Sequence, residues 1–164
     1  MNGQISEEAF LQLIEANKGI IIKICNSYCP DKNFRQDLAQ EIIYHLWKSG
    51  NSFQPGYKFS TWMYRIALNV AISFYRKQRT QPELVSYTTD TDLVDTTGET
   101  GIPEENIIRL QQLINEMNVL DKALMILYLE SKTYAEIAEI LGITETNVAT
   151  KLSRIKGRLK LRLQ

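Results

Sequence analysis

The stretch from Thr133 to Leu163, TYAEIAEILGITETNVATKLSRIKGRLKLRL, predicts two helices joined by a tight turn. Thr133 is a suitable N-cap for the first helix, and Glu136 follows it at the spacing of a capping box. Gly142 is suited to the left-handed conformation that ends many helices. Four apolar residues recur at helical spacing and are expected to share one buried face of the first helix: Tyr134, Ile137, Ala138 and Leu141.

The second helix of the pair is expected to begin after Thr144, another N-cap candidate, and to bury a stripe of Val148, Leu152, Ile155 and Leu159. Its other side carries small polar and cationic side chains, which suit base edges and phosphates in a major groove. Residues 144–164 include six Lys or Arg and one acidic residue, although the whole chain has a formal net charge of zero. We therefore interpret the segment as a DNA-binding helix-turn-helix, against the alternative of a hairpin with a solvated charged face. The predicted DNA contacts are Thr144, Thr146, Asn147, Thr150, Lys151, Arg154 and Arg158.

The chain has 164 residues, enough for one medium domain or two small ones, and its composition is ordinary for a globular protein. It contains no apolar run long enough to span a bilayer and no charged-then-apolar leader, so a cytoplasmic location is expected. The zero net charge argues weakly against general nucleic-acid affinity. The local balance matters more, because the charge is strongly segregated along the chain.

Cys25 and Cys29 lie four residues apart, on one face of an expected helix. Together with the single His45 they are too few for a structural zinc site, and this spacing on a helix does not favour a disulfide. We expect reduced, packed thiols, with a redox switch as the lesser alternative. We expect no catalytic residue, metal, cofactor or small-molecule substrate, because the sequence has no catalytic constellation and no phosphate-binding glycine loop.

Helical spacing predicts one helix from Glu7 to about Cys29 and another from about Phe34 to Lys48. The second carries acidic, amide and aromatic side chains away from its apolar side. Such a surface is either solvated or a docking site for a partner whose helices carry arginines, and the sequence leaves these two interpretations about even. The candidate docking residues are Asp37, Gln40, Glu41, Tyr44 and Trp47.

A loop rich in Gly, Pro and aromatic residues follows from Ser49 to Ser60, and a helix is then predicted from Thr61 to about Thr80, capped by Ser60. Residues 58–79 contain five cations and no acidic residue, interleaved with aromatic rings. Cations follow a phosphate backbone and rings stack on unpaired bases, although aromatic residues here could instead belong to the core. The candidate nucleic-acid contacts are Lys58, Phe59, Trp62, Tyr64, Arg65, Asn69, Arg76, Lys77 and Arg79.

Residues 81–103 contain five acidic residues, no Lys or Arg, and several Gly and Pro, which predicts a flexible acidic linker. Helical spacing returns at about 104–118 and 120–130, and the second of these is apolar almost all round. We therefore predict an all-α fold with two small helical domains, residues 1–80 and 104–164, joined by the linker 81–103.

In this order the elements resemble the extracytoplasmic-function group of bacterial sigma factors, over nearly the whole chain. The segment DLAQE at 37–41, followed by Trp47, is similar to the polymerase-binding helix of that family. The segment FSTWMYRIALN at 59–69 is similar to its helix for opening and reading the −10 element, and YAEIAEILGI at 134–143 with Val148 is similar to its −35-reading domain.

The resemblance implies a promoter-specificity subunit with no chemistry of its own. The docking residues of 37–47 would grip the β′ clamp helices of core RNA polymerase, and the β flap would be a further contact. The loop before Trp62 would capture a base flipped out of the non-template strand, with Asn69 facing its neighbours. The C-terminal helix would lie in the −35 major groove, and the linker would thread the active-site cleft and RNA exit path. An anti-sigma factor, often held at the inner membrane, is a further implied partner.

Two positions depart from the family pattern: Ala149 stands where a basic residue is frequent, and Gly157 stands where Ala is frequent. The first leaves the −35 preference open, and the second should loosen the helix slightly. Two other functions remain open from the residues alone. A free-standing helix-turn-helix regulator would bind duplex DNA by itself, and a helical adaptor would bind proteins only.

Overall fold

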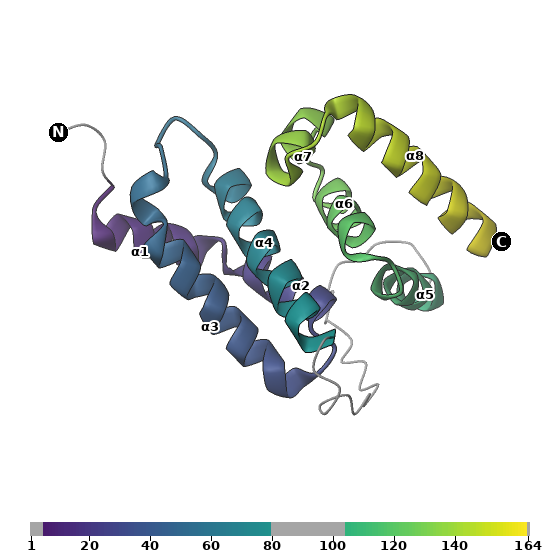
Figure 1. The fold of residues 1–164 in the computed structure, drawn as a ribbon, viewed down its shortest axis with the longest axis horizontal. Helices are drawn as coiled ribbons and strands as arrows, with labels where there is room; N and C mark the ends of the chain where they lie inside the picture. The colour runs from purple at the N-terminus through teal and green to yellow at the C-terminus, as the bar shows by residue number, and fades with distance from the viewer. Residues whose placement is uncertain (1–4, 80–103, 164) are drawn as a thin grey trace. The chain divides into compact units, whose positions relative to one another are not determined.

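The computed structural model describes residues 5–79 and 104–163, and every regular element in these ranges is helical (Figure 1). The chain divides into two compact units between Thr88 and Thr89. The all-α prediction is confirmed. The predicted linker 81–103 lies outside the described residues. Within these ranges, no helix is long and apolar enough to cross a membrane.

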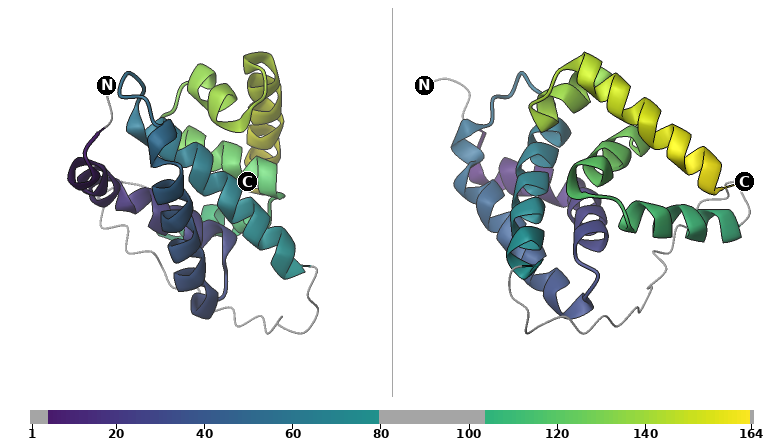
Figure 2. Two further views of the ribbon diagram at one scale, coloured as in Figure 1. Left: turned by 60° about the vertical axis from the view of Figure 1, so that its left-hand side comes forward. Right: turned by 45° about the vertical axis from the view of Figure 1, so that its right-hand side comes forward.

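The N-terminal unit contains α1 (Glu7–Ala16), α2 (Lys18–Tyr28), α3 (Lys32–Lys48), a 3-10 turn η1 (Gly50–Ser52) and α4 (Phe59–Arg79). In Figures 1 and 2, α4 runs beside α3, and both pack against α2. The core between these helices includes several side chains with no exposed surface: Ile24, Leu38, Ile42, Leu46, Met63 and Ala67.

The prediction of one continuous helix from Glu7 to Cys29 is wrong, because the chain breaks at Asn17. The Asn17 side-chain amide donates to the carbonyl oxygen of Leu13 at 2.8 Å. Asn side chains offer the backbone such local alternatives to a helix, and Asn17 leaves helical geometry with ψ of 17°. Likewise α4 begins at Phe59 and not at Thr61, so Ser60 is inside the helix and is not its cap.

The C-terminal unit contains α5 (Glu104–Asn115), α6 (Val119–Leu129), α7 (Tyr134–Leu141) and α8 (Glu145–Arg162). Both predicted threonine caps are confirmed: Thr133 Oγ1 accepts from the Glu136 amide and Thr144 Oγ1 from the Asn147 amide, each at 3.1 Å. Gly142 has the left-handed φ of 70° that separates the two helices. The helix-turn-helix is therefore confirmed, as the turn between α7 and α8 shows in Figure 2.

The buried stripe of α8 is the predicted one, Val148, Leu152, Ile155 and Leu159. The predicted face of α7 is only partly correct. Ile137 and Ala138 are buried as expected, but Ile140 is buried in addition and Tyr134 is exposed. Tyr134 is the first residue of α7, so its ring lies at the open end of the helix.

Cys25 and Cys29 are free thiols, and both are buried, as predicted. Burial raises the pKa of each thiol to about 11. Cys29 also donates to the carbonyl oxygen of Asp31 at 3.4 Å. Among the described residues, no cluster of three or more His, Cys, Asp or Glu could hold a metal ion.

Candidate nucleic-acid and partner-binding surfaces

An apolar groove lies between α1 and α3 and contains both of the predicted docking aromatics. Gln40, Tyr44 and Trp47 follow one another at helical spacing along α3 and line this groove, with a volume of about 490 Å³. Tyr44 is 58% exposed and Trp47 is 47% exposed, so large apolar side chains lie open to solvent. Such a patch marks an interaction site more often than a plain surface. The other lining residues of this α1/α3 groove are Leu11, Ile14 and Ile43.

Glu41 is a neighbour of Tyr44 on α3 but does not line this groove. It lines a second groove, between α3 and α4, together with Asn69 and Lys77. Asp37 is exposed on α3, one turn before both Gln40 and Glu41. The five predicted docking residues follow helical spacing along α3, but they are divided between two grooves, and Glu41 is grouped with residues predicted to contact DNA. The remaining residues of the α3/α4 groove are His45, Ile66, Val70, Ser73 and Phe74.

Five aromatic rings, Phe10, Trp47, Phe53, Phe59 and Trp62, form an aromatic cluster at the start of α4. Phe53, Phe59 and Trp62 are all in contact with one another, with ring centroids 5.2–5.4 Å apart. Phe53 and Phe59 are buried and Trp62 is half-buried. These rings therefore form a base beneath residues 53–58, the loop that leads into α4.

The cationic side of α4 is open to solvent. Lys58 is exposed just before the helix, Arg65 and Asn69 are exposed along its first half, and Arg76, Lys77 and Arg79 are exposed in its last turns. The last three also lie where the helix dipole favours positive charge. All six candidates are thus able to reach a ligand.

The prediction that Tyr64 contacts nucleic acid is wrong. Its side chain is 1% exposed, and burial raises its pKa to about 12. Tyr64 follows Met63 on the side of α4 that faces the core, so two adjacent residues are buried there. Phe59 is likewise buried, so little of its ring is open to contact with nucleic acid.

The first turns of α8 present the predicted polar side chains. Thr146, Asn147, Thr150 and Arg154 are exposed, and Lys151 is half-buried. The Thr150 hydroxyl donates to the carbonyl oxygen of Thr146 at 3.0 Å, which fixes its orientation. The oxygen of Thr144 accepts the hydrogen bond that caps α8, so its hydroxyl also has a role in the fold.

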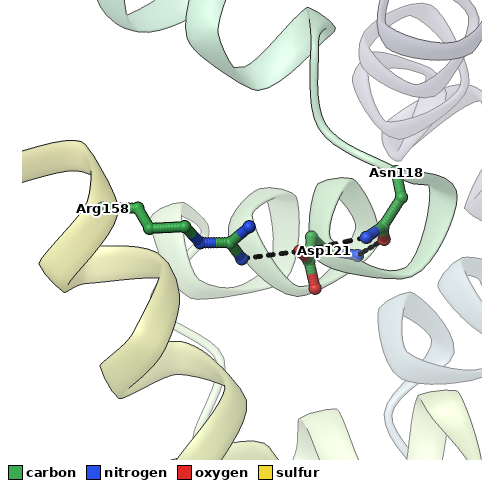
Figure 3. A network of polar contacts seen from close by, with 3 residues as sticks. All are labelled: Asn118, Asp121 and Arg158. Carbon is green, nitrogen blue, oxygen red and sulfur yellow. Dashed lines mark hydrogen bonds and ion pairs between the residues drawn. The ribbon is translucent and has the colours of Figure 1, made fainter. Parts of the chain in front are cut away.

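Arg158 points toward α6 and pairs with Asp121 (Figure 3). Its Nη2 lies 2.9 Å from Asp121 Oδ2, while Asn118 Nδ2 donates to the same carboxylate oxygen at 3.2 Å. The Asp121 amide in turn donates to Asn118 Oδ1 at 2.9 Å, which caps α6. Arg158 therefore holds α8 against the start of α6 in addition to any contact it makes outside the domain. Arg158 and Asp121 are 37 residues apart, so no local spacing predicts their contact.

Two other cations of α8 also have partners inside the unit. Arg162 Nη1 lies 2.9 Å from Glu116 Oε2. Lys156 Nζ lies 4.0 Å from the ring centroid of Tyr128, and the hydrogen bond between these two side chains raises the pKa of Lys156. The basic character of the segment is therefore divided between holding the fold and facing solvent.

Both units match family models. Residues 13–81 match the model described as Sigma-70 region 2, and residues 107–159 match the one described as Sigma-70, region 4. The ECF RNA polymerase sigma factor SigW of Bacillus subtilis is 28% identical over 174 residues, covering 96% of this chain and 89% of SigW. The chain belongs to the extracytoplasmic-function group of sigma-70 factors.

Solved structures of sigma factors have the same fold. CnrH, in complex with the cytosolic domain of CnrY, superposes with a TM-score of 0.68 at 17% identity, covering 96% of this chain and 89% of CnrH. The sigma factor RpoE of Bartonella quintana, in complex with the anti-sigma factor NepR, has a TM-score of 0.65 at 18% identity, covering 96% and 94%. In sigma-factor terms, the two grooves and the aromatic cluster belong to region 2 and its N-terminal flank, and α8 belongs to region 4.

Proposed function

We propose that this protein is an alternative sigma factor that binds core RNA polymerase and directs it to specific promoters. The observation that carries this conclusion is the presence of region 2 and region 4 in one chain, each with an exposed surface suited to its part. A free-standing regulator would use only the helix-turn-helix and would leave the exposed rings of the α1/α3 groove without a role.

Polymerase docking is assigned to the exposed side chains of α3. Gln40, Tyr44 and Trp47 offer apolar area and an amide, which are features of interface hot spots. Asp37 and Glu41 add negative charge at the edges, where it would steer a basic partner helix. By resemblance this partner is the β′ clamp, and the β flap would contact region 4.

Reading and opening of the −10 element are assigned to α4 and the loop before it. Flipping a base out of the stack costs a few kcal/mol, which must be offset by a preformed pocket and by contacts to the backbone. The aromatic cluster supports the loop that would receive the base. Asn69 is exposed on α4, about two turns after Trp62. Lys58, Arg65, Arg76, Lys77 and Arg79 would follow the phosphates.

Reading of the −35 element is assigned to α8. Thr146, Asn147 and Thr150 are exposed near its start, where helix-turn-helix proteins contact base edges. Lys151 and Arg154 would contact phosphates or bases from the next turn. Ala149 replaces a frequent basic residue, so part of the preference would come from groove shape.

As a subunit of polymerase, the protein would act in the cytoplasm and would contribute recognition and melting, while the polymerase performs the chemistry. The bound NepR in the RpoE structure supports an anti-sigma factor as a further partner here. Such a partner would compete with polymerase for the same exposed apolar surface.

The test is in vitro transcription of a fragmented genomic template by core polymerase with and without this protein. Transcripts with defined start sites that appear only with the protein would establish the function and give both promoter elements. Binding to duplex DNA without polymerase would instead favour the free-standing regulator. Co-elution with core polymerase but no transcripts from any template would favour an adaptor.

A further inference from the structure

Phe10 of α1 lies at the centre of the aromatic cluster, although it precedes the residues matched by the region 2 model. Its ring centroid is 5.9 Å from that of Phe59 and 5.9 Å from that of Trp62, both in edge-on geometry. Edge-on contacts of this kind are attractive beyond simple burial. Phe10 and Phe53 thus both contact the two rings in the first turn of α4.

The same ring also supports η1, at the start of the loop. A methyl group added at Gly50 would lie 3.2 Å from Cζ of Phe10 and 3.5 Å from its Cε1 and Cε2. The backbone of η1 therefore rests on the ring, and an added methyl group would fit only if the ring moved by a few tenths of an ångström. One side chain of α1 consequently fixes both ends of residues 50–59.

The third neighbour of Phe10 is Trp47, with ring centroids 6.0 Å apart. Trp47 lines the α1/α3 groove, which also contains Leu11, the residue next to Phe10. A partner helix seated in that groove would therefore press on Trp47. Trp47 contacts Phe10, and Phe10 supports η1 at the start of the loop.

We propose that Phe10 is a positioning residue for capture of the flipped −10 base, and that its contact with Trp47 links polymerase docking to the shape of the capture loop. The inference rests on the proposed function. Phe10 is buried and does not touch DNA itself; it acts by holding Phe59, Trp62 and the η1 backbone in place. Small displacements matter, since a loop out of place loses the stacking that offsets base flipping.

The test is a double-mutant cycle that combines substitutions in the protein with the removal of single bases from the DNA. The binding affinity is measured for holoenzyme made from core polymerase and the full chain. The probe is a labelled single-stranded oligonucleotide carrying the −10 element of a promoter found by transcription, with an abasic nucleotide at each position in turn. Wild-type holoenzyme should lose affinity sharply at the captured position. Phe10→Leu should bind the intact oligonucleotide roughly ten-fold more weakly, within the contribution of one stacked base, and should lose little more at the abasic position.

A matched variant separates positioning from general stability. Ile21→Ala removes buried apolar surface from α2 in the same unit but lies outside the aromatic cluster and both grooves. It should lower the melting temperature while keeping the full wild-type penalty at the captured position. If Phe10→Leu also keeps that full penalty, the positioning role is overturned.

Gly50→Ala provides a second route that leaves Phe10 in place. Its methyl group pushes on the ring, so it should reproduce the base-specific loss in the wild-type chain and add nothing to Phe10→Leu. Additive losses would overturn the inference. Failure of the proposed function would look different, because wild-type holoenzyme would then give no promoter-specific transcripts and no captured position.

Discussion

Two glycines of the helix-turn-helix differ in what their backbone allows. Neither Gly142 nor Gly157 has another atom within 4 Å of an added Cβ, so space is equal at both. Gly142 has φ of 70°, whereas Gly157 lies inside α8. Gly157→Ala should therefore raise the free energy of unfolding by about 0.5–1 kcal/mol, because alanine loses less backbone entropy in a helix. Urea unfolding followed by circular dichroism measures the change.

Gly142→Ala is the opposite member of the pair. A left-handed alanine costs roughly 1–2 kcal/mol, so this variant should be destabilised by that amount. If both variants shift the free energy of unfolding in the same direction, the backbone conformation of the two glycines would not explain the result. Packing of the added methyl group would then be the cause.

The buried thiols should resist alkylation. Because burial raises the pKa of Cys25 and Cys29 from 9.0 to about 11, little thiolate is present near pH 8. Iodoacetamide should label both only after unfolding in urea, as counted by mass spectrometry. By linkage, the stability that the neutral thiols contribute is fully present below pH 9 and falls as pH rises toward 11. Rapid labelling of the native protein at pH 8 would revive the redox alternative.

Residue by residue, the sequence predicted best where the deciding interactions are local. Thr133, Gly142 and Thr144 are near the groups they cap, so their roles follow from spacing alone. Tyr64 was misassigned because α4 is apolar on more than one side, and spacing does not say which side meets α2 and α3.

At the scale of single helices, Arg158 and Asp121 join α8 to the start of α6. If Lys151 contacts a phosphate, Lys151→Gln should reduce the salt dependence of holoenzyme binding to −35 DNA by about 0.9 in the slope of log K against log salt. Arg158→Gln should leave this slope unchanged, because its partner is a carboxylate of the same unit. The binding constants are measured by filter binding at several salt concentrations.

The ion pair between Arg158 and Asp121 should stabilise the C-terminal unit only modestly. The Arg158 side chain is 65% exposed, so solvent screens the interaction and its loss should cost about 0.5–1 kcal/mol. Asp121→Asn should cost a similar amount. A rise in DNA affinity for Asp121→Asn would instead show that the carboxylate competes with DNA for the guanidinium.

Helix boundaries show what local patterns miss. The break at Asn17, whose side chain donates to Leu13, lies in a segment whose apolar spacing is otherwise continuous. The Arg158–Asp121 contact joins positions 37 residues apart, and nothing in either local sequence indicates it. The two grooves along α3 likewise depend on how α1 and α4 pack against it.

At the scale of the whole molecule, exposed apolar side chains should differ in importance by location. Tyr44→Ala should weaken binding to core polymerase by about 1–3 kcal/mol, because Tyr44 lies in the α1/α3 groove. Ile22→Ala is a matched control, since Ile22 is similarly exposed, at 54%, but on α2 and outside the groove. Equal affinities in a competition assay with labelled protein would remove the groove from the docking surface.

The two-domain organisation was predictable from the whole chain because each half has its own apolar stripes, separated by an acidic segment without helical spacing. The arrangement of the candidate surfaces was not. Glu41 and Tyr44 are three residues apart and are neighbours on α3, yet they line different grooves, one between α3 and α4 and the other between α1 and α3.

The aromatic cluster also has an optical consequence. The chain has two tryptophans, Trp47 and Trp62, and both lie in this cluster. Intrinsic tryptophan fluorescence therefore arises wholly from the N-terminal unit, whereas circular dichroism sums the helices of both units. Fluorescence and dichroism melting curves recorded on one sample would report whether the two units unfold independently.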